Sequence, residues 1–222
     1  MIILILILAA LLVVTLLFAG SLNIGWNLYL RSVNKLPNSK DEVMITFDDG
    51  PHPLYTGKVL DLLAKREVKA LFFMIGERAL ANPALVKRVA DEGHTIGIHS
   101  MNHNIRFTFA SSRVVKEDLS KCKELLERIS GREVNLFRPP FGVTNPNIAK
   151  AVKEIGLVCV GWSIRSLDTV IRSNNKVVNR VGNKLLPSGI ILLHDSLPTS
   201  VEVLDGVLEK IRQRRLKTAV LK

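Results

Sequence analysis

The stretch Val43-Met44-Ile45-Thr46-Phe47-Asp48-Asp49-Gly50-Pro51 joins a short apolar run to two adjacent carboxylates. Residues 43–47 are rich in β-branched and aromatic side chains, which is typical of a buried strand. Asp, Gly and Pro are common turn formers, so residues 48–51 in isolation favour a simple turn. Their position directly after a buried strand, together with a histidine pair further along the chain, indicates instead that the two carboxylates line a site.

The same kind of apolar run recurs along the chain. We expect seven strands, at residues 43–47, 70–75, 95–99, 134–137, 157–163, 189–193 and 218–221. We expect helices between them, at residues 54–66, 83–92, 111–129, 146–155, 174–186 and 200–214. Strict alternation of strands and helices predicts an α/β fold with parallel strands and helices outside.

Polar residues lie at or just past the ends of five different predicted strands. They are Asp48 and Asp49, His99, Arg138, Asp168 and His194. Barrel enzymes build their active sites at the carboxyl ends of many strands, whereas an open sheet gathers its ligands mainly at one switch point. The pattern therefore favours a TIM-like barrel.

The first thirty residues differ from the rest of the chain. Residues 1–30 carry no charged side chain, and residues 2–18 are almost entirely Ile, Leu, Val and Ala, long enough for a hydrocarbon core that takes ~20 residues to cross. We expect a transmembrane anchor or signal segment over 1–30, and we favour an uncleaved anchor because the features of a signal peptide are poorly formed. Residues 31–42 are then a short linker, and residues 43–222 a single folded domain.

Two observations conflict over the side of the membrane on which the folded domain lies. Arg31, Lys35 and Lys40 follow the apolar segment, and the positive-inside tendency by itself would hold the domain in the cytoplasm. The chemistry argued below suits a polymer of the cell envelope, and three charges are a modest bias. We therefore expect a membrane-anchored or exported domain that faces the envelope or the outside.

The overall charge and the cysteines add little to the site. A net charge of +11 indicates attraction to anionic partners, and most of it is typical of a solvated surface. We expect no nucleic-acid partner, because aromatic residues make up only 5% of the chain and no binding motif accompanies the charge. Cys122 and Cys159 fall on a predicted helix and a predicted buried strand, and we expect both to be reduced.

The segment His99-Ser100-Met101-Asn102-His103 is the second informative motif. A single histidine is usually structural, but two at a four-residue spacing after a strand can converge on one ion. One Asp and two His form the ligand set of a hydrolytic metal centre that keeps an open position for water, and a second Asp is then available to take a proton. The two motifs together predict metal-assisted hydrolysis.

Two further segments support a catalytic site. Arg138-Pro139-Pro140-Phe141-Gly142 suits a rigid loop, but its Arg is also able to hold a carboxylate ionised. Leu192-Leu193-His194-Asp195 ends a buried strand in a charged pair, which is an expensive place for polar side chains unless they are used. We therefore expect a function for both segments.

Taken in order, five segments resemble the motifs of the polysaccharide deacetylase family, which has the NodB homology domain and is carbohydrate esterase family 4. They are residues 46–51, 99–103, 138–141, Trp162-Ser163 leading to Asp168, and 192–194. The resemblance covers about residues 43–221. It implies a distorted (β/α)7 barrel and metal-dependent removal of acetyl groups from a glycan, most often from the N-acetylglucosamine units of peptidoglycan, a chitin-like polymer or another polysaccharide.

The resemblance also implies roles for individual residues. Asp49, His99 and His103 would bind a divalent metal, typically Zn²⁺, with Co²⁺ or another divalent ion as alternatives. Asp48 would be the catalytic base that deprotonates water, and His194 the general acid that protonates the departing amine.

Three more residues receive supporting roles from the same resemblance. Arg138 would hold Asp48, Asp168 would hold and tune His194, and the backbone N–H of Phe141 would help the metal to stabilise the oxyanion. A cation beside the base and an anion beside the acid would give the two groups opposite protonation at one pH.

The chain departs from the family pattern around the substrate. Thr169 follows Asp168 where a Trp is common, Arg165 stands where an acid is frequent, and Phe141 replaces a Tyr. An O-acetyl esterase acting on a glycan such as xylan and a non-catalytic glycan-binding homologue therefore remain alternatives. A non-haem iron oxygenase uses a similar ligand set, but would be expected on an all-β scaffold and gives no role to Asp48, Arg138 or His194.

Overall fold

The computed structural model describes residues 1–221. Its helices are α1 (Ile2–Leu22), α2 (Thr56–Lys65), α3 (Gly76–Ala81), α4 (Pro83–Asp91), α5 (Ser112–Ser130), α6 (Pro146–Ile155), α7 (Asn174–Lys184) and α8 (Ser200–Gln213), with short 3-10 turns η1 (Ile24–Trp26), η2 (Ile105–Phe109) and η3 (Pro140–Gly142). Its strands are β1 (Ser32–Val33), β2 (Glu42–Gly50), β3 (Leu71–Met74), β4 (Thr95–Ile98), β5 (Leu136–Phe137), β6 (Val158–Val160), β7 (Ile164–Arg165), β8 (Ile190–His194) and β9 (Lys217–Thr218).

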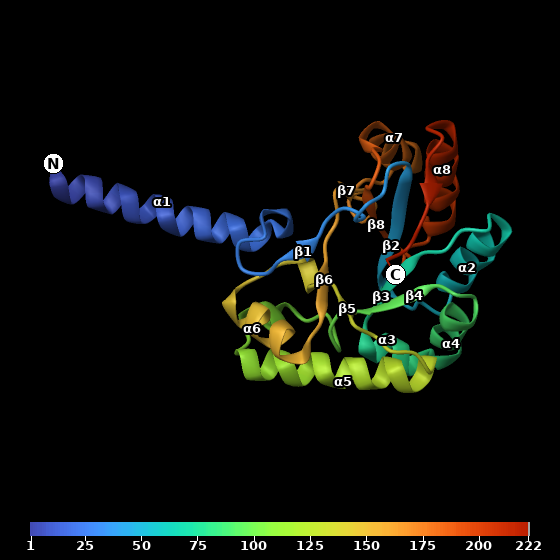
Figure 1. Ribbon diagram of the computed structural model, residues 1–222, viewed down its shortest axis with the longest axis horizontal. Coiled ribbons are helices and arrows are strands. Elements are labelled where there is room, and N and C mark those ends of the chain that lie inside the picture. The colour runs from blue at the N-terminus through green and yellow to red at the C-terminus, as the bar shows by residue number, and fades with distance from the viewer. Residues whose placement is uncertain (222) are drawn as a thin grey trace.

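The strands form one curled parallel sheet with helices on its outer side (Figure 1). Its order is β1-β6-β5-β4-β3-β2-β8-β7, and β9 pairs with the first residues of β2. Strands β2 to β8 are the seven strands of a distorted (β/α)7 barrel, so the predicted fold class is confirmed.

The barrel is incompletely closed, because β1 and β7 are edges of the sheet. The chain that follows β1 joins the two sides at the bottom of the barrel. Val33 O accepts a hydrogen bond from Gly161 N at 3.0 Å, and Leu36 N donates to Ser188 O at 2.8 Å. Residues 31–42, which we expected to be a linker, therefore belong to the barrel through backbone hydrogen bonds that composition does not reveal.

Side-chain alternation along β2 separates two apolar layers. Val43, Ile45 and Phe47 pack toward the helices in the larger core cluster. Met44 points into the barrel interior, in a second cluster with residues of β3, β6 and β8. Because residues two apart share one face of a strand, Thr46 and Asp48 lie on the interior side with Met44.

Two predicted strands differ from the observed ones. The run 157–163 contains only β6, and β7 begins separately at Ile164, because Gly161 and Trp162 carry the chain from one side of the barrel gap to the other. The last predicted strand is β9, which lies against the start of β2 and is not one of the seven barrel strands. Helix α3 was not predicted, since its six residues are too short to show a period.

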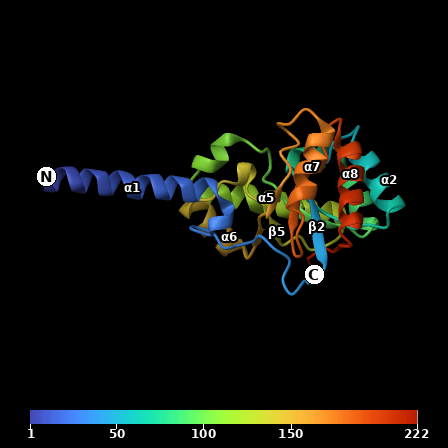
Figure 2. The same cartoon turned by 90° about the horizontal axis from the view of Figure 1, so that it is seen from above.

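Helix α1 projects away from the barrel in both views (Figures 1 and 2). It is 21 residues long and apolar enough to cross a membrane, and none of its most apolar window is buried. Cys122 and Cys159 are both buried free thiols, as expected.

Candidate active site

A cavity of about 220 Å³ opens at the carboxyl ends of the barrel strands. It is lined by Asp48, Asp49, His99, His103, Phe141, Gly142, Trp162, Arg165, Ser166, Leu167, Thr169, Leu192 and His194. Six of the eight residues predicted for the site are in this lining. The other two, Arg138 and Asp168, lie behind it and contact Asp48 and His194.

A β-bulge at the end of β2 brings both neighbouring carboxylates to the cavity. Asp48 pairs with Phe73 of β3 and Gly50 with Met74, so Asp49 is the extra residue. Asp49 has a φ of 69°, which is uncommon for a residue with a side chain. Consecutive residues of a regular strand point to opposite faces, and the bulge removes that constraint. This local conformation is what allows two adjacent Asp side chains to serve one site.

Three possible metal-ligand atoms lie within 4.8 Å of one another, one each from Asp49, His99 and His103. Asp49 Oδ1 lies 3.5 Å from His99 Nε2 and 3.4 Å from His103 Nε2. His103 follows β4 on a tight loop in which Ser100 Oγ accepts its backbone N–H at 3.0 Å. Ser100 and His103 both have positive φ, at 64° and 53°. Strained backbone of this kind is common at binding sites.

These three residues fit a divalent metal. Asp49 Oδ1 is buried and has no hydrogen-bond partner among the described residues, which is costly unless a cation satisfies it. Ligand atoms about 2.0–2.2 Å from a tetrahedral ion lie about 3.3–3.5 Å apart, close to the separations seen here. His99 Nδ1 contacts the Arg138 carbonyl oxygen at 2.7 Å and must donate to it, which leaves Nε2 with the lone pair. Burial lowers the pKa of His99 to about 3, so its ring is neutral and able to ligate.

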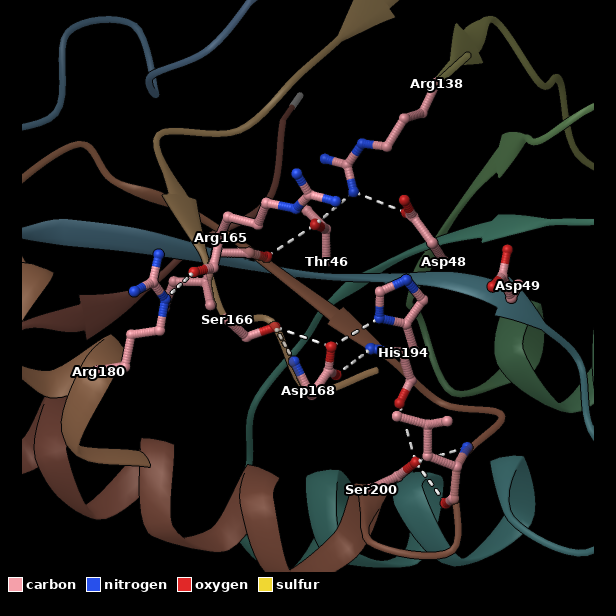
Figure 3. Close-up of polar contacts among 12 residues, drawn as sticks. Thr46, Asp48, Asp49, Arg138, Arg165, Ser166, Asp168, Arg180, His194 and Ser200 are labelled. Carbon is pink, nitrogen blue, oxygen red and sulfur yellow. Dashed lines mark hydrogen bonds and ion pairs between the residues drawn. The ribbon is translucent and has the colours of Figure 1, made fainter. Parts of the chain in front are cut away.

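Arg138 is fully buried behind the cavity, and each of its three guanidinium nitrogens donates a hydrogen bond; Figure 3 shows it beside Asp48 and Thr46. Its Nη1 donates to Asp48 Oδ1 and to Thr46 Oγ1, both at 2.7 Å. Its Nε and Nη2 donate to the carbonyl oxygens of Val160 and Gly161 at 3.0 and 2.7 Å. Burial raises the pKa of Asp48, while the charge and hydrogen bond of Arg138 oppose that rise.

His194 and Asp168 form a second pair beside the first, because His194 of β8 is the register partner of Asp48 of β2 (Figure 3). Asp168 Oδ1 lies 2.8 Å from His194 Nδ1, and its Oδ2 accepts the backbone N–H of His194 at 2.8 Å. Burial by itself would lower the pKa of His194, but the hydrogen bond and charge of Asp168, together with the charges of Asp48 and Asp49, outweigh burial and raise the pKa to about 9. The imidazole is therefore protonated at neutral pH, and its Nε2 is available to the cavity.

The rim of the cavity is partly aromatic. Phe141 is 48% exposed, has a φ of 60° and packs its ring 4.4 Å from that of His103. Trp162 lines the cavity next to Gly142, with the guanidinium of Arg165 5.9 Å from the Trp ring. Thr169 also lines the cavity. Where the family commonly has a Trp, this chain therefore has a small side chain and lacks an aromatic wall.

Several supporting residues were not predicted. Thr46 could be inferred from its place two residues before Asp48 on the same face of β2. Ser166 Oγ donates to Asp168 Oδ1 at 2.9 Å, and Asp118 on α5 accepts the backbone N–H of Met101 at 3.0 Å. Thr56 was not predicted either, and its Oγ1 donates at 2.5 Å to Asp195, whose segment was expected to be functional. Asp118 comes from the middle of a helix, where no local pattern marks it.

The fold and the cavity define an α/β-barrel enzyme whose polar groups suit hydrolysis. Residues 35–160 match the family model described as polysaccharide deacetylase, which is more than half of the chain. The chain belongs to the polysaccharide deacetylase family and is a hydrolase of that class. Members of this family are generally dependent on a divalent metal.

Related proteins agree with this assignment. The chain is 41% identical over 163 residues to a peptidoglycan-N-acetylglucosamine deacetylase of Bacillus cereus, covering 72% of this chain and 76% of that protein. The crystal structure of a peptidoglycan N-acetylglucosamine deacetylase superposes with a TM-score of 0.79 at 33% identity, covering 85% of this chain and 89% of that one. A pseudoenzyme of carbohydrate esterase family 4 from Bacillus anthracis has a TM-score of 0.78 at 25% identity, covering 85% of this chain and 66% of that one. The fold by itself therefore does not establish turnover, which depends on the residues of the site.

Proposed function

We propose that this protein is a metal-dependent N-deacetylase that hydrolyses the acetamido groups of N-acetylglucosamine units in a peptidoglycan-like glycan. One observation carries the proposal: a base paired with a cation and an acid paired with an anion line one cavity, with the Asp-His-His cluster beside them. Hydrolysis of an amide needs a proton removed from water and a proton given to the amine. Two relatives are peptidoglycan N-acetylglucosamine deacetylases, so an acetylated glycan is the proposed class of substrate.

The metal we propose is Zn²⁺, with Co²⁺ as an alternative, held by Asp49, His99 and His103. When bound, such an ion supplies Lewis acidity to the acetyl carbonyl and lowers the pKa of a water molecule. The site has two nitrogen ligands and one oxygen ligand, which suits zinc better than a hard, all-oxygen cation.

Asp48 is the proposed base. Its Oδ1 is held by Arg138, which leaves Oδ2 facing the cluster at 3.9 Å from His99 Nε2. Oδ2 accepts a proton from the attacking water. A carboxylate whose pKa is raised by burial is a stronger base than one in water, and the Arg138 guanidinium keeps it ionised in spite of that burial.

His194 is the proposed acid. Its Nδ1 is fixed by Asp168, so the proton that it can give is on Nε2, which faces the cavity. That proton goes to the nitrogen of the sugar as the bond between nitrogen and the acetyl carbon breaks. Acetate and a free amine are the products, and the backbone N–H of Phe141 is the proposed donor to the oxyanion.

We further propose that α1 is retained as a membrane anchor and that the barrel lies on the envelope side. Helix α1 has the length and composition of a membrane span. Peptidoglycan lies outside the cytoplasmic membrane, so a barrel acting on such a glycan must face it. This placement is the reverse of what Arg31, Lys35 and Lys40 favour under the positive-inside tendency.

The test is acetate release by the purified full-length chain with added Zn²⁺ or Co²⁺. Substrates are N-acetylglucosamine oligomers, peptidoglycan and acetylated xylan, and mass spectrometry of the products identifies the sugar that has lost its acetyl group. We expect release from N-acetylglucosamine and a loss of about 10²–10⁴-fold in Asp48→Asn. Asp91→Asn, at an exposed carboxylate paired with Lys87, is the matched control and should keep full activity.

Three outcomes would contradict the proposal. Release only from xylan would make the protein an O-acetyl esterase. Binding of the glycan without any release of acetate would make it a non-catalytic homologue. Equal activity of Asp48→Asn and the wild type would remove Asp48 from its proposed role.

A further inference from the structure

The carboxyl end of α1 is built into the barrel domain. Ser21 Oγ donates to the carbonyl oxygen of Thr144 at 2.6 Å, and Thr144 N donates to the carbonyl oxygen of Ser21 at 2.9 Å. Gly20 is buried, and a Cβ at that position would clash with Leu28. A helix held by two hydrogen bonds and a packed glycine is a fixed extension of the domain and not a loose tether.

The chain after α1 returns along the last turns of the helix. Tyr29 Oη donates to the carbonyl oxygen of Leu17 at 3.2 Å. A helix of 21 residues is about 31 Å long, close to the ~30 Å hydrocarbon core, so its last turns reach the bilayer boundary. Residues 26–29 must then lie at the same level. Trp26 and Leu28 are 52% and 48% exposed there, and Trp and Tyr favour this depth.

A second exposed apolar segment is tied to the same place. Asn145, next to Thr144, donates from Nδ2 to the carbonyl oxygen of Thr108 in η2 at 2.7 Å. The following residue, Phe109, is 84% exposed, the most exposed aromatic side chain in the described part of the chain. A ring of this size gains nothing from water, whereas a headgroup layer beside α1 would cover it.

A cationic cleft adjoins the helix end. Its volume is about 510 Å³, and its lining includes Tyr29, Arg31, Lys150 and Lys153 and no acidic residue. Glu154, the acidic neighbour of Lys153, is paired with Lys116 at 3.0 Å. Cations set beside an apolar membrane span are complementary to anionic phospholipid headgroups.

We propose that the surface around the carboxyl end of α1 is a membrane-docking surface. It holds the barrel against a bilayer that contains anionic phospholipid. It consists of Trp26, Leu28 and Phe109, which enter the headgroup layer, and Arg31, Lys150 and Lys153, which bind lipid phosphates. The inference rests on the proposal that α1 is a retained anchor. It does not depend on the chemistry of the cavity.

The docked position determines how far the cavity lies from the bilayer surface. Phe141 lines the cavity and is three residues from Thr144, so at most about 11 Å of chain separates it from the residue that is hydrogen-bonded to Ser21 of α1. The cavity therefore opens close to the bilayer. The glycan within its reach is the layer nearest to the membrane.

The test uses the full chain in phospholipid nanodiscs and measures Trp quenching by brominated lipids. The chain has two Trp residues, Trp26 and Trp162. A protein with Trp26→Phe, Trp162→Phe and Phe109→Trp carries one probe in the docking surface. Its control has Leu54→Trp in place of Phe109→Trp. Leu54 is 63% exposed and lies two residues before α2 in the chain, and α2 lies at the end of the barrel away from α1 (Figure 2).

We expect the probe at 109 to be quenched by shallow brominated lipids and the probe at 54 to show no quenching. Equal, negligible quenching at both positions would overturn docking, because a loosely tethered domain leaves both in water. A membrane-extracted chain whose intact mass lacks residues 1–21 would overturn it as well.

The charges are tested separately in the probe-109 protein. Arg31→Gln, Lys150→Gln and Lys153→Gln together should reduce its quenching by about half or more in nanodiscs with phosphatidylglycerol and have little effect in phosphatidylcholine alone. Lys58→Gln, Lys65→Gln and Lys69→Gln on the far side are the matched control. Equal effects of the two triple variants would overturn the role of the cationic cleft. Acetate release from a soluble oligomer by the first triple variant in the otherwise native chain should equal that of the wild type, so failure of docking and failure of the proposed chemistry are distinguishable.

Discussion

Arg138 and Asp48 form an ion pair at 2.7 Å in which their side chains are 0% and 6% exposed. Removing both charges from water is costly, and their attraction offsets that cost only when the remaining donors and acceptors are satisfied. Here the other donors of Arg138 reach a threonine hydroxyl and two carbonyl oxygens. The pair therefore couples the stability of the barrel interior to the ionisation of the proposed base.

Arg138→Met should destabilise the protein and inactivate it. The substitution leaves Asp48 buried without its cation, which typically costs about 3–5 kcal/mol, and Asp48 then becomes protonated at neutral pH. Denaturant unfolding and acetate release measure the two effects. Asp48→Asn should change the unfolding free energy less in the Arg138→Met background than in the wild type. A variant as stable as the wild type would show that the pair contributes nothing to the fold.

Asp168→Asn should move the alkaline limit of activity to lower pH. A general acid works while it holds its proton, so wild-type kcat should fall as pH rises through about 9, the raised pKa of His194. Without Asp168, burial still lowers the pKa of His194, and only the charges of Asp48 and Asp49 remain to raise it. The alkaline limit should then lie at a lower pH than that of the wild type. The measurement is kcat against pH from about 6 to 10, with Asp205→Asn at the exposed partner of Arg66 as control. An unchanged alkaline limit would show that Asp168 does not raise the pKa of the general acid.

Removal of the divalent ion should abolish acetate release, and Zn²⁺ or Co²⁺ should restore it. His103→Ala removes one of the three proposed ligands and should lower the zinc content measured by elemental analysis. His52→Ala is the control, because His52 stacks on Tyr55 outside the cluster and should leave the zinc content unchanged. Full activity after exhaustive chelation would exclude the proposed metal.

Much of the fold follows from local patterns in the sequence. The buried runs of β2, β3, β4 and β8 are long enough to show strand composition, and helix α5 begins at its Ser111 cap and ends at Gly131 in the left-handed conformation. Short elements such as β1, β7 and α3 carry two to six residues, too few for a period, and are fixed by their neighbours in space. The split of the run 157–163 belongs to this second group.

Some residues of the site could likewise be predicted from local patterns, and others could not. Asp48, Asp49, His99 and His194 lie at or just past the carboxyl ends of predicted strands, which indicates one rim, and the structure brings them together. The bulge that turns Asp49 toward Asp48 is a matter of register between strands, and no single-chain pattern encodes it. Supporting groups from helices and loops, such as Asp118 and Ser166, depend on tertiary packing alone.

We expect Asp118 to be a positioning residue for the loop that joins His99 to His103. Its Oδ1 accepts the backbone N–H of Met101 at 3.0 Å, between His99 and His103 in the chain. Asp118→Ala removes this acceptor, and the loss of an outer partner of a ligand loop typically weakens metal affinity about 10–100-fold. Asp118→Asn keeps an acceptor oxygen and should lose much less. Competitive zinc titration of the two variants measures the difference. An Ala variant that binds zinc as tightly as the Asn variant would mean that Ser100 and the strained backbone hold His103 without help from α5.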